Sequence, residues 1–484
     1  MTKTLHLRRL AAVAAALGAL FLGSACSSFF DVPNTNQPNL EDLLQNPTRT
    51  KLAGAATGLF AGARTDIQGL IWRVGSLGRE GINLSGNNQP DYLEPYFLSS
   101  LVGSGFGGAL WGGRYTHIRN INIYLAALAK VGTGEVSDPE KAASRAVANT
   151  LKALAFMYVI ETRDSLGAPV DVDLPITAPL GLFVNRDSVY RYITGLLDSA
   201  QADLGRAVAT PFPFPIPSGF GSFNTPGTFV AVNRALAAKA QVLRATASGC
   251  GTPCYTAALT ALSGSFITNS SADFATGAYF NFSAGSNDVT NDLSDPLGSV
   301  NFYAHPSEIA DAQLQIGGAK DQRVLDKIAA ATDTQLVGGI SEIPGTDKFT
   351  VYFTGGVADQ NHSIPIIRDE ELVLLRAEAN WFAGSKVQAL ADIDSVRVKA
   401  GKLAPTTLTI ASPDADFVTE LMYDRRYSLM WEQGTRWIDA RRFNRMGDLP
   451  ATPPTGGHIA KVMPVPDFEC AARGKPTSCT PLFP

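Results

Sequence analysis

The sequence predicts a mainly α-helical protein in which consecutive helices pair as hairpins, with long irregular loops and little β structure. The first observation is a helical periodicity of apolar residues, with small Ala and Gly residues on one face. It recurs in residues 48–63, 109–131, 138–163, 187–206, 230–247, 254–263, 367–383, 386–400, 416–434 and 436–446. The second observation is a shared plan in 232–264 and 371–401: an Ala-rich helix, a turn with Gly, and a second helix with Ala and Leu. Small residues let helices approach closely, so the plan indicates stacked hairpins like those of tetratricopeptide (TPR) repeats. The repeat period is irregular, so the fold is predicted to be only TPR-like.

The chain begins with a segment typical of a secretory leader. Three basic residues, Lys3, Arg8 and Arg9, precede an apolar run over 10–22, and small residues follow. The run is too short to cross a bilayer, which takes roughly 20 apolar residues. A basic start, an apolar centre and small residues describe a cleaved signal. Residues 1–25 are therefore predicted to be a signal peptide.

Cys26 follows directly after the small residues Ser24 and Ala25, where a lipoprotein signal peptidase would cut. The fit to a lipobox is incomplete, because Gly23 stands where an aliphatic residue is usual. The alternative is an ordinary secretory signal with an incidental cysteine. More than one acyl chain gives stable anchoring, so we expect a lipid-anchored protein with a polar tether over 26–42 that leads into a helix near Leu43. No later segment has the length and apolarity to span a membrane.

Charge and composition exclude some functions. The whole chain has 40 Lys and Arg against 44 Asp and Glu, and loss of the three leader cations leaves 37 against 44, a net charge of −7. No basic patch interleaved with aromatic residues is present, which argues against nucleic-acid binding. The charged fraction of 17% is below the usual ~25%, and the chain contains 45 Gly and 29 Pro. This composition indicates a large, well-buried protein with long ordered loops.

The remaining cysteines form two local pairs, Cys250 with Cys254 and Cys470 with Cys479. An exported protein meets an oxidising compartment, so each pair is predicted to be a disulfide. The alternative is a metal site, but the C-x3-C and C-x8-C spacings and the five scattered histidines provide no recognisable ligand set. We predict no metal and no cofactor.

Three long stretches separate the helical segments: 74–108, 207–229 and 265–365. They contain aromatic residues, which disordered segments lack, so we expect ordered loops with a function. Residues 43–484 are therefore predicted to form one helical domain with these loops as insertions.

The C-terminal third carries three motifs in order: "IPIIRDEELVLLRAEANWFAG" with "DIDSVRVKAG", then "LMYDRRYSLMWEQGTRWIDARRFNRMG", then "KVMPVPDFECAARG". Together they resemble the SusD/RagB family of bacterial outer-membrane lipoproteins. The matching positions are Arg368, Glu370, Glu371, Ala377 to Ala379, Asp394, Val396, Arg397, Lys399, Ala400, Gly401, Asp424, Arg425, Arg426, Leu429, Glu432, Gly434, Arg436, Trp437, Asp439, Arg441, Arg442, Pro464, Pro466 and Glu469. Departures from the family pattern are Asp394, Lys399, Asp424, Ser428 and the inserted Gln433. Upstream, "ALWGGRYTHIRNINIYL" and "LGAPVDVDLPI" extend the resemblance over nearly the whole mature chain.

The charges of the second motif are predicted to support the fold. On one helix, Glu432 and Arg436 would lie four residues apart and Arg436 and Asp439 three apart, so each carboxylate could reach the guanidinium. The many arginines nearby would keep the carboxylates ionised, which argues against a catalytic acid pair. Trp111 shares a helical pattern with apolar neighbours, so a packing role is preferred to ligand stacking, and Trp381 and Trp437 are interpreted in the same way.

The resemblance implies a SusD-like fold and a non-enzymatic, cell-surface lipoprotein of the outer membrane. Such a protein would bind nutrient oligomers, above all oligosaccharides, and act as the lid of a SusC-like TonB-dependent transporter. Two other functions stay open. One is a TPR-like envelope adaptor that binds no small ligand. The other is a secreted hydrolase, which the sequence does not favour because it has no nucleophile-elbow motif.

Two loop stretches combine aromatic rings with amides, the groups that suit sugar rings and their hydroxyls. They are "NNQPDYLEPYF" and "AYFNFSAGSNDVTNDLSDPLGSVNFYAHP". The candidate ligand-binding residues are Asn87, Asn88, Tyr92, Tyr96, Tyr279, Asn281, Phe302 and Tyr303. The alternative for any one of them is that its ring only packs a loop onto the scaffold.

Overall fold

The structure, a computed structural model, describes residues 40–83, 99–175, 177–247, 249–268, 270–285, 288–294, 302–337, 340–450, 458–475, 479–481 and 483. The predicted signal peptide, Cys26 and most of the tether lie outside these residues. Within the described ranges, no helix is both long and apolar enough to pass through a membrane.

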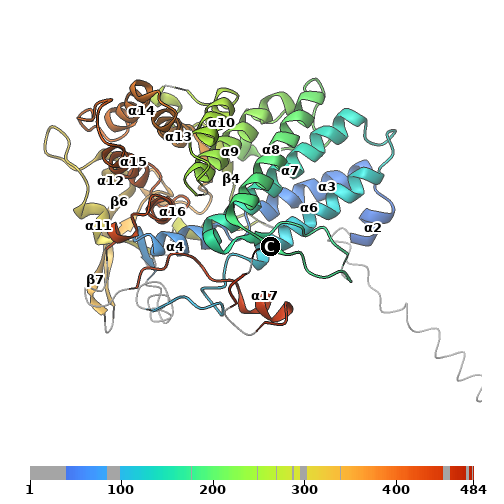
Figure 1. Ribbon diagram of the computed structural model, residues 1–484, viewed down its shortest axis with the longest axis horizontal. Helices are drawn as coiled ribbons and strands as arrows, with labels where there is room; N and C mark the ends of the chain where they lie inside the picture. Colours follow the sequence, from blue (N-terminus) through green and yellow to red (C-terminus); the bar gives the residue numbers. More distant parts are fainter. Residues whose placement is uncertain are drawn as a thin grey trace, which may run out of the picture.

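Helices make up most of the first half of the chain, and consecutive ones pack against each other from residue 112 onward (Figure 1). They are α2 (Leu40–Gln45), α3 (Arg49–Ala63), α4 (Ile67–Leu77), α6 (Gly112–Lys130), α7 (Asp138–Arg163), α8 (Arg186–Arg206), α9 (Pro226–Ala247) and α10 (Thr252–Ser263). Their starts follow from local chemistry. Before α7 the Glu140 carboxylate accepts the Ser137 amide at 2.9 Å, and before α8 the Asn185 side chain accepts the Ser188 amide at 2.9 Å. The predicted mainly α fold of stacked hairpins is confirmed.

A second group of helices follows near the C-terminus and lies beside the first (Figure 1). It consists of α13 (Asp369–Phe382), α14 (Lys386–Lys399), α15 (Asp414–Ser428) and α16 (Thr435–Arg442), while α17 (Asp467–Ala472) lies apart from it. Helix α13 packs against α9 and α10 and so joins the two groups. The indole of Trp381 stacks on Phe417 with ring centroids 4.1 Å apart. Trp111, Trp381 and Trp437 are all buried, which confirms their predicted packing role.

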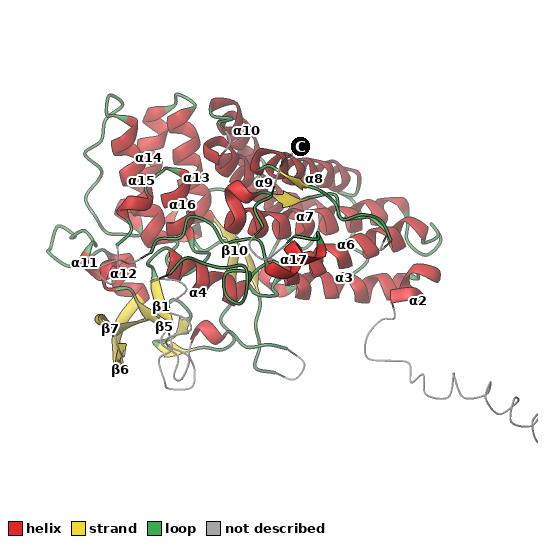
Figure 2. Ribbon diagram, turned by 60° about the horizontal axis from the view of Figure 1, so that its bottom comes forward, coloured by secondary structure: helices red, strands yellow, loops and turns green. Residues whose placement is uncertain are grey.

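The stretch 265–365 is not the irregular loop that the sequence suggested. It contributes most of a four-stranded antiparallel sheet at one end of the molecule, in the order β1–β5–β7–β6 (Figure 2). These strands are β1 (Gly81–Asn83), β5 (Phe302–Ala304), β6 (Ile328–Val337) and β7 (Ile340–Phe349). Shorter pairs and helices are β2 (Ala168–Pro169) with β3 (Phe183–Val184), β4 (Gly277–Phe280) with β10 (Ile364–Arg368), β8 (Phe353–Thr354) with β9 (Val357–Ala358), α11 (Pro306–Ala310) and α12 (Gln322–Lys327).

The ion pairs expected from spacing in the second motif are wrong. Helix α15 ends at Ser428, and α16 begins at Thr435. Gly434 between them has a φ of 67°, a left-handed backbone conformation that glycine adopts without steric cost. Glu432 therefore does not share a helix with Arg436.

Each charge of that motif has a partner elsewhere. Glu432 pairs with Arg368 at 3.0 Å and with Lys327 at 3.3 Å. Arg436 reaches Glu308 at 2.7 Å, and Asp439 accepts from Arg425 and Arg442, both at 2.7 Å. The charges thus tie the terminal helices to several other segments, as their predicted role in fold support requires.

The structure joins both predicted cysteine pairs. Cys250 and Cys254 connect the end of α9 to α10, with Cα atoms 5.7 Å apart. Cys470 on α17 is bonded to Cys479, with Cα atoms 5.6 Å apart. Both links close short loops, so they act locally and leave the packing between helix groups to other contacts.

We predict that Arg436→Ala lowers the free energy of unfolding by about 3–5 kcal/mol, because a buried charge pair loses one partner. The Arg436 guanidinium donates to Glu308 and, at 2.6 Å, to the Arg79 carbonyl. Urea denaturation monitored by tryptophan fluorescence measures the change. Arg445→Ala is the matched control, because its side chain is 34% exposed and pairs with Asp448 at 3.6 Å. A smaller loss for Arg436→Ala than for this control would contradict the prediction.

Candidate functional site

Two adjoining cavities lie at the corner between α3 and α4. The first, of about 890 Å³, is lined by residues 61–69 and by residues from 283 to 292. The second, of about 420 Å³, is lined by aromatic, amide and hydroxyl side chains from 57 to 64, 217 to 220 and 279 to 281. Both are bounded by Arg64 and Asp288. Arg64 and Asp288 form an ion pair, so the two cavities make up one two-part recess that this pair divides.

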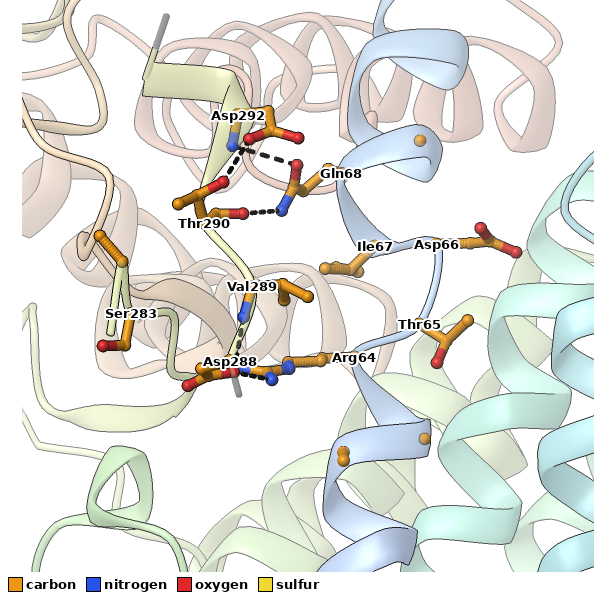
Figure 3. A pocket seen from close by; sticks show the side chains of 14 residues that line it. Arg64, Thr65, Asp66, Ile67, Gln68, Ser283, Asp288, Val289, Thr290 and Asp292 are labelled. Carbon is orange, nitrogen blue, oxygen red and sulfur yellow. Dashed lines mark hydrogen bonds and ion pairs between the residues drawn. The ribbon is translucent and has the colours of Figure 1, made fainter. Parts of the chain in front are cut away.

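Arg64 stands at the C-terminal end of α3 and points across the recess (Figure 3). Its guanidinium donates to the Asp288 carboxylate and to the Asn281 carbonyl, and it lies 5.4 Å from the Phe282 ring centroid. Partial burial would raise the pKa of Asp288, but hydrogen bonds from Arg64 and from the Val289 amide, with the Arg64 charge, hold that pKa below its usual value. The Asp288 carboxylate is therefore ionised at neutral pH where it faces Arg64.

Gln68, on the first turn of α4, holds the facing segment through its amide group (Figure 3). Its Nε2 donates to the Thr290 carbonyl at 2.7 Å, and its Oε1 accepts the Asp292 amide at 3.1 Å. The Thr290 hydroxyl in turn donates to Asp292 Oδ1 at 2.6 Å. Arg64 and Gln68 thus position the 288–292 segment. Neither residue was predicted from the sequence.

The second cavity has aromatic walls with an amide at the rim. Phe60 and Phe220 meet edge to face with centroids 5.3 Å apart, and Tyr279 and Asn281 lie at the end of β4. Asn281 Nδ2 donates to Ser218 Oγ at 2.6 Å. A Cβ on Gly219 would approach the Tyr279 carbonyl to 2.2 Å, so only glycine lets this turn come so near the strand. The result is a partly apolar, partly hydrogen-bonding surface.

The structure separates the sequence-predicted site residues. Asn87, Asn88, Tyr92 and Tyr96 lie outside the described residues. Tyr279 and Asn281 come together at the second cavity. Phe302 and Tyr303 do not join them, since both lie on β5.

The two residues on β5 have packing contacts. Tyr303 is completely buried, and Phe302 contacts Trp72 and Trp431 with centroids 6.3 and 5.9 Å apart. A buried ring presents no face to a ligand, so in this structure Tyr303 stabilises the sheet.

The chemistry available at the recess is that of binding. Its aromatic rings can cover apolar surface, and its amides, carboxylates and hydroxyls can pair with a polar ligand. Nowhere in the described part of the chain do three or more His, Cys, Asp or Glu side chains gather as they would around a metal ion.

Comparison with known proteins shows that this architecture is similar to that of SusD-like proteins. The model of the SusD family matches residues 330–468. NanU from B. fragilis superposes with a TM-score of 0.62 at 15% identity, over 92% of this chain and 98% of NanU. A SusD superfamily protein from Bacteroides vulgatus gives a TM-score of 0.65 at 15% identity, over 89% and 99%. A SusD-like carbohydrate binding protein from Bacteroides fragilis gives 0.65 at 14% identity, also over 89% and 99%. No curated protein matches the chain.

We predict that Tyr303→Ala destabilises the protein by about 3–5 kcal/mol, as loss of a large buried ring does, whereas Tyr279→Ala costs no more than about 1 kcal/mol. Tyr303 is fully buried, and Tyr279 lies at a cavity rim. Denaturant unfolding of both variants measures the difference. Equal losses in the free energy of unfolding would contradict the prediction, because they would mean that both rings contribute equally to stability.

Proposed function

We propose that this chain, a member of the SusD/RagB family, binds nutrient oligomers at the two-part recess and passes them to a SusC-like TonB-dependent transporter. Oligosaccharides are the preferred ligand class. The observation that carries the proposal is the second cavity, where the half-buried ring of Tyr279 lies beside the amide of Asn281 and the rings of Phe60 and Phe220 are buried in the wall. Sugar rings have an apolar face that packs on aromatic rings, and hydroxyls that need hydrogen-bond partners.

The size and division of the recess also favour an oligomer. Cavities that bind small molecules usually measure about 300–1,000 Å³, and each part of this recess is within that range, at about 890 and 420 Å³. Two adjoining parts offer places for successive units of one ligand. Among similar structures, one is described as a SusD-like carbohydrate binding protein, which supports the same ligand class.

Anchoring at the cell surface is part of the proposal. Its support is the basic and apolar leader, the small residues before Cys26 and the polar tether that follows. A lipid anchor would leave the helical domain free to sit over a transporter in the same outer membrane. Loop residues Asn87, Asn88, Tyr92 and Tyr96 stay candidates for ligand contact.

The competing function is a TPR-like adaptor that docks envelope proteins without a small ligand. Stacked helix hairpins serve such a role in general. An adaptor gives no reason for an aromatic cavity with a positioned amide, so ligand binding is the better account of the recess.

We predict that a panel of neutral oligosaccharides contains ligands that raise the melting temperature, and that Tyr279→Ala weakens binding of the best one at least about fivefold, near the ~1 kcal/mol expected for an aromatic contact. Isothermal titration calorimetry measures the affinity. Tyr279→Phe is the matched control, since it keeps the ring and removes only the hydroxyl, which donates to the Ala275 carbonyl. Normal affinity in Tyr279→Ala and Asn281→Ala would exclude the second cavity as the site.

We also predict that Cys26→Ala releases the protein from the outer membrane, because the lipidated thiol is lost. Membrane fractionation in cells without the transporter measures retention, and mass spectrometry of wild-type protein identifies the acylated N-terminal cysteine. A variant that stays with the membrane under these conditions would argue against the anchor.

A further inference from the structure

A third recess, of about 530 Å³, lies in a different part of the fold, among α8, α9 and α10. Six polar side chains line it: Asp198, Gln201, Arg234, Gln241, Thr260 and Ser263. The rest of its lining consists of alanines and a glycine. It shares no lining residue with the two cavities at the α3–α4 corner. We refer to it as the α8–α10 groove.

Arg234 in this groove is 6% exposed and keeps one nitrogen without a partner. Its Nε donates to Asn233 Oδ1 at 2.9 Å, and its Nη1 pairs with Asp198 Oδ1 at 2.9 Å. Nη2 is buried and has no hydrogen-bond acceptor among the described residues. The Asp198 pair explains why an arginine connects α9 to α8, but it leaves the donors of Nη2 unused.

Gln241, two turns further along α9, provides the complementary group. Its Oε1 is also buried without a donor among the described residues. Leaving a buried polar group without a hydrogen bond costs about 1–3 kcal/mol. Two residues that line the same groove therefore have an unused donor and an unused acceptor beneath its surface.

The chemistry of the lining points to a neutral ligand. The Arg234 charge is already balanced by Asp198, so an added anion would compete with that carboxylate. The other lining groups are the Gln201 amide and the Thr260 and Ser263 hydroxyls. A hydroxyl both accepts and donates, so a ligand with several hydroxyls has a partner for the Nη2 donor and for the Oε1 acceptor.

We propose that the α8–α10 groove is a second binding site, for a small neutral ligand rich in hydroxyls, namely a mono- or disaccharide unit. None of its lining side chains is aromatic, so recognition there uses hydrogen bonds and not ring stacking. The inference does not depend on the nutrient role of the α3–α4 recess, because different residues form the two sites.

The test uses the folded domain with glucose, galactose, mannose and maltose as probes. Saturation-transfer NMR detects weak binding, and hydrogen exchange locates it. We expect at least one probe to bind and to protect amides of α9 and α10. Gln241→Leu should weaken this binding at least tenfold while leaving the domain folded, since it removes a buried acceptor that has no partner.

Thr260→Val and Thr256→Val form a matched pair on α10. Both hydroxyls donate to the carbonyl four residues earlier, at 3.1 and 3.0 Å, but only Thr260 lines the groove. Thr260→Val should weaken probe binding and Thr256→Val should not. Tyr279→Ala should also leave binding in the groove unchanged, which separates this proposal from the nutrient site.

Four outcomes would overturn the inference. They are no binding by any of the four sugars, protection confined to other helices, equal affinity in Gln241→Leu and wild type, and binding of glycine or acetate in preference to the sugars. The last result would mean that Arg234 recognises a carboxylate. Absence of sugar binding would mean that ordered water satisfies Nη2 and Oε1.

Discussion

The position of the strand pair that carries one wall of the site depends on the pairing of Arg368, a buried arginine at the end of β10. Its guanidinium donates to both oxygens of Glu432 at 3.0 Å, to Glu370 and to the Phe274 carbonyl. These contacts join β10 to α13, to the segment between α15 and α16 and to the chain before β4. Because an unpaired buried charge costs several kcal/mol, these segments can be packed only in the arrangement that satisfies the charges.

The site follows from that arrangement through strand pairing. Strand β10 pairs with β4, with Ile364 opposite Phe280 and Pro365 opposite Tyr279. Asn281 comes directly after β4, so its amide is presented where the strand leaves the sheet. The charge network at the end of β10 thus fixes the strand against which β4 pairs, and β4 carries Tyr279 and leads into Asn281.

Local chemistry explains which parts of the structure could be predicted from the sequence. Helix α7 was expected over 138–163 and has those bounds, because its apolar periodicity and its capping residues lie within the helix itself. Strands β1 and β5 were missed because they are short and stabilise each other across a long separation in the chain. Composition suggested ligand contact for both Tyr279 and Tyr303. Only the strand pairing shows that Tyr279 lies at the rim of the second cavity and that Tyr303 is buried. Arg64 and Gln68 were missed since their partners Asn281 and Thr290 come 217 and 222 positions later.

The ion pair inside the recess and the ion pair that fixes β10 contribute different amounts to stability. The Arg64 and Asp288 side chains are 19% and 32% exposed, and partly exposed pairs contribute about 1 kcal/mol or less. Arg368 and Glu432 are 10% and 7% exposed, and loss of one partner in such a pair costs about 3–5 kcal/mol. The boundary between the two cavities can therefore yield to a ligand at small cost, while the strand that carries Tyr279 and Asn281 stays fixed. The proposed binding of oligomers would benefit from this division, because a fixed wall would preserve recognition of one unit and a weakly held boundary would admit the next.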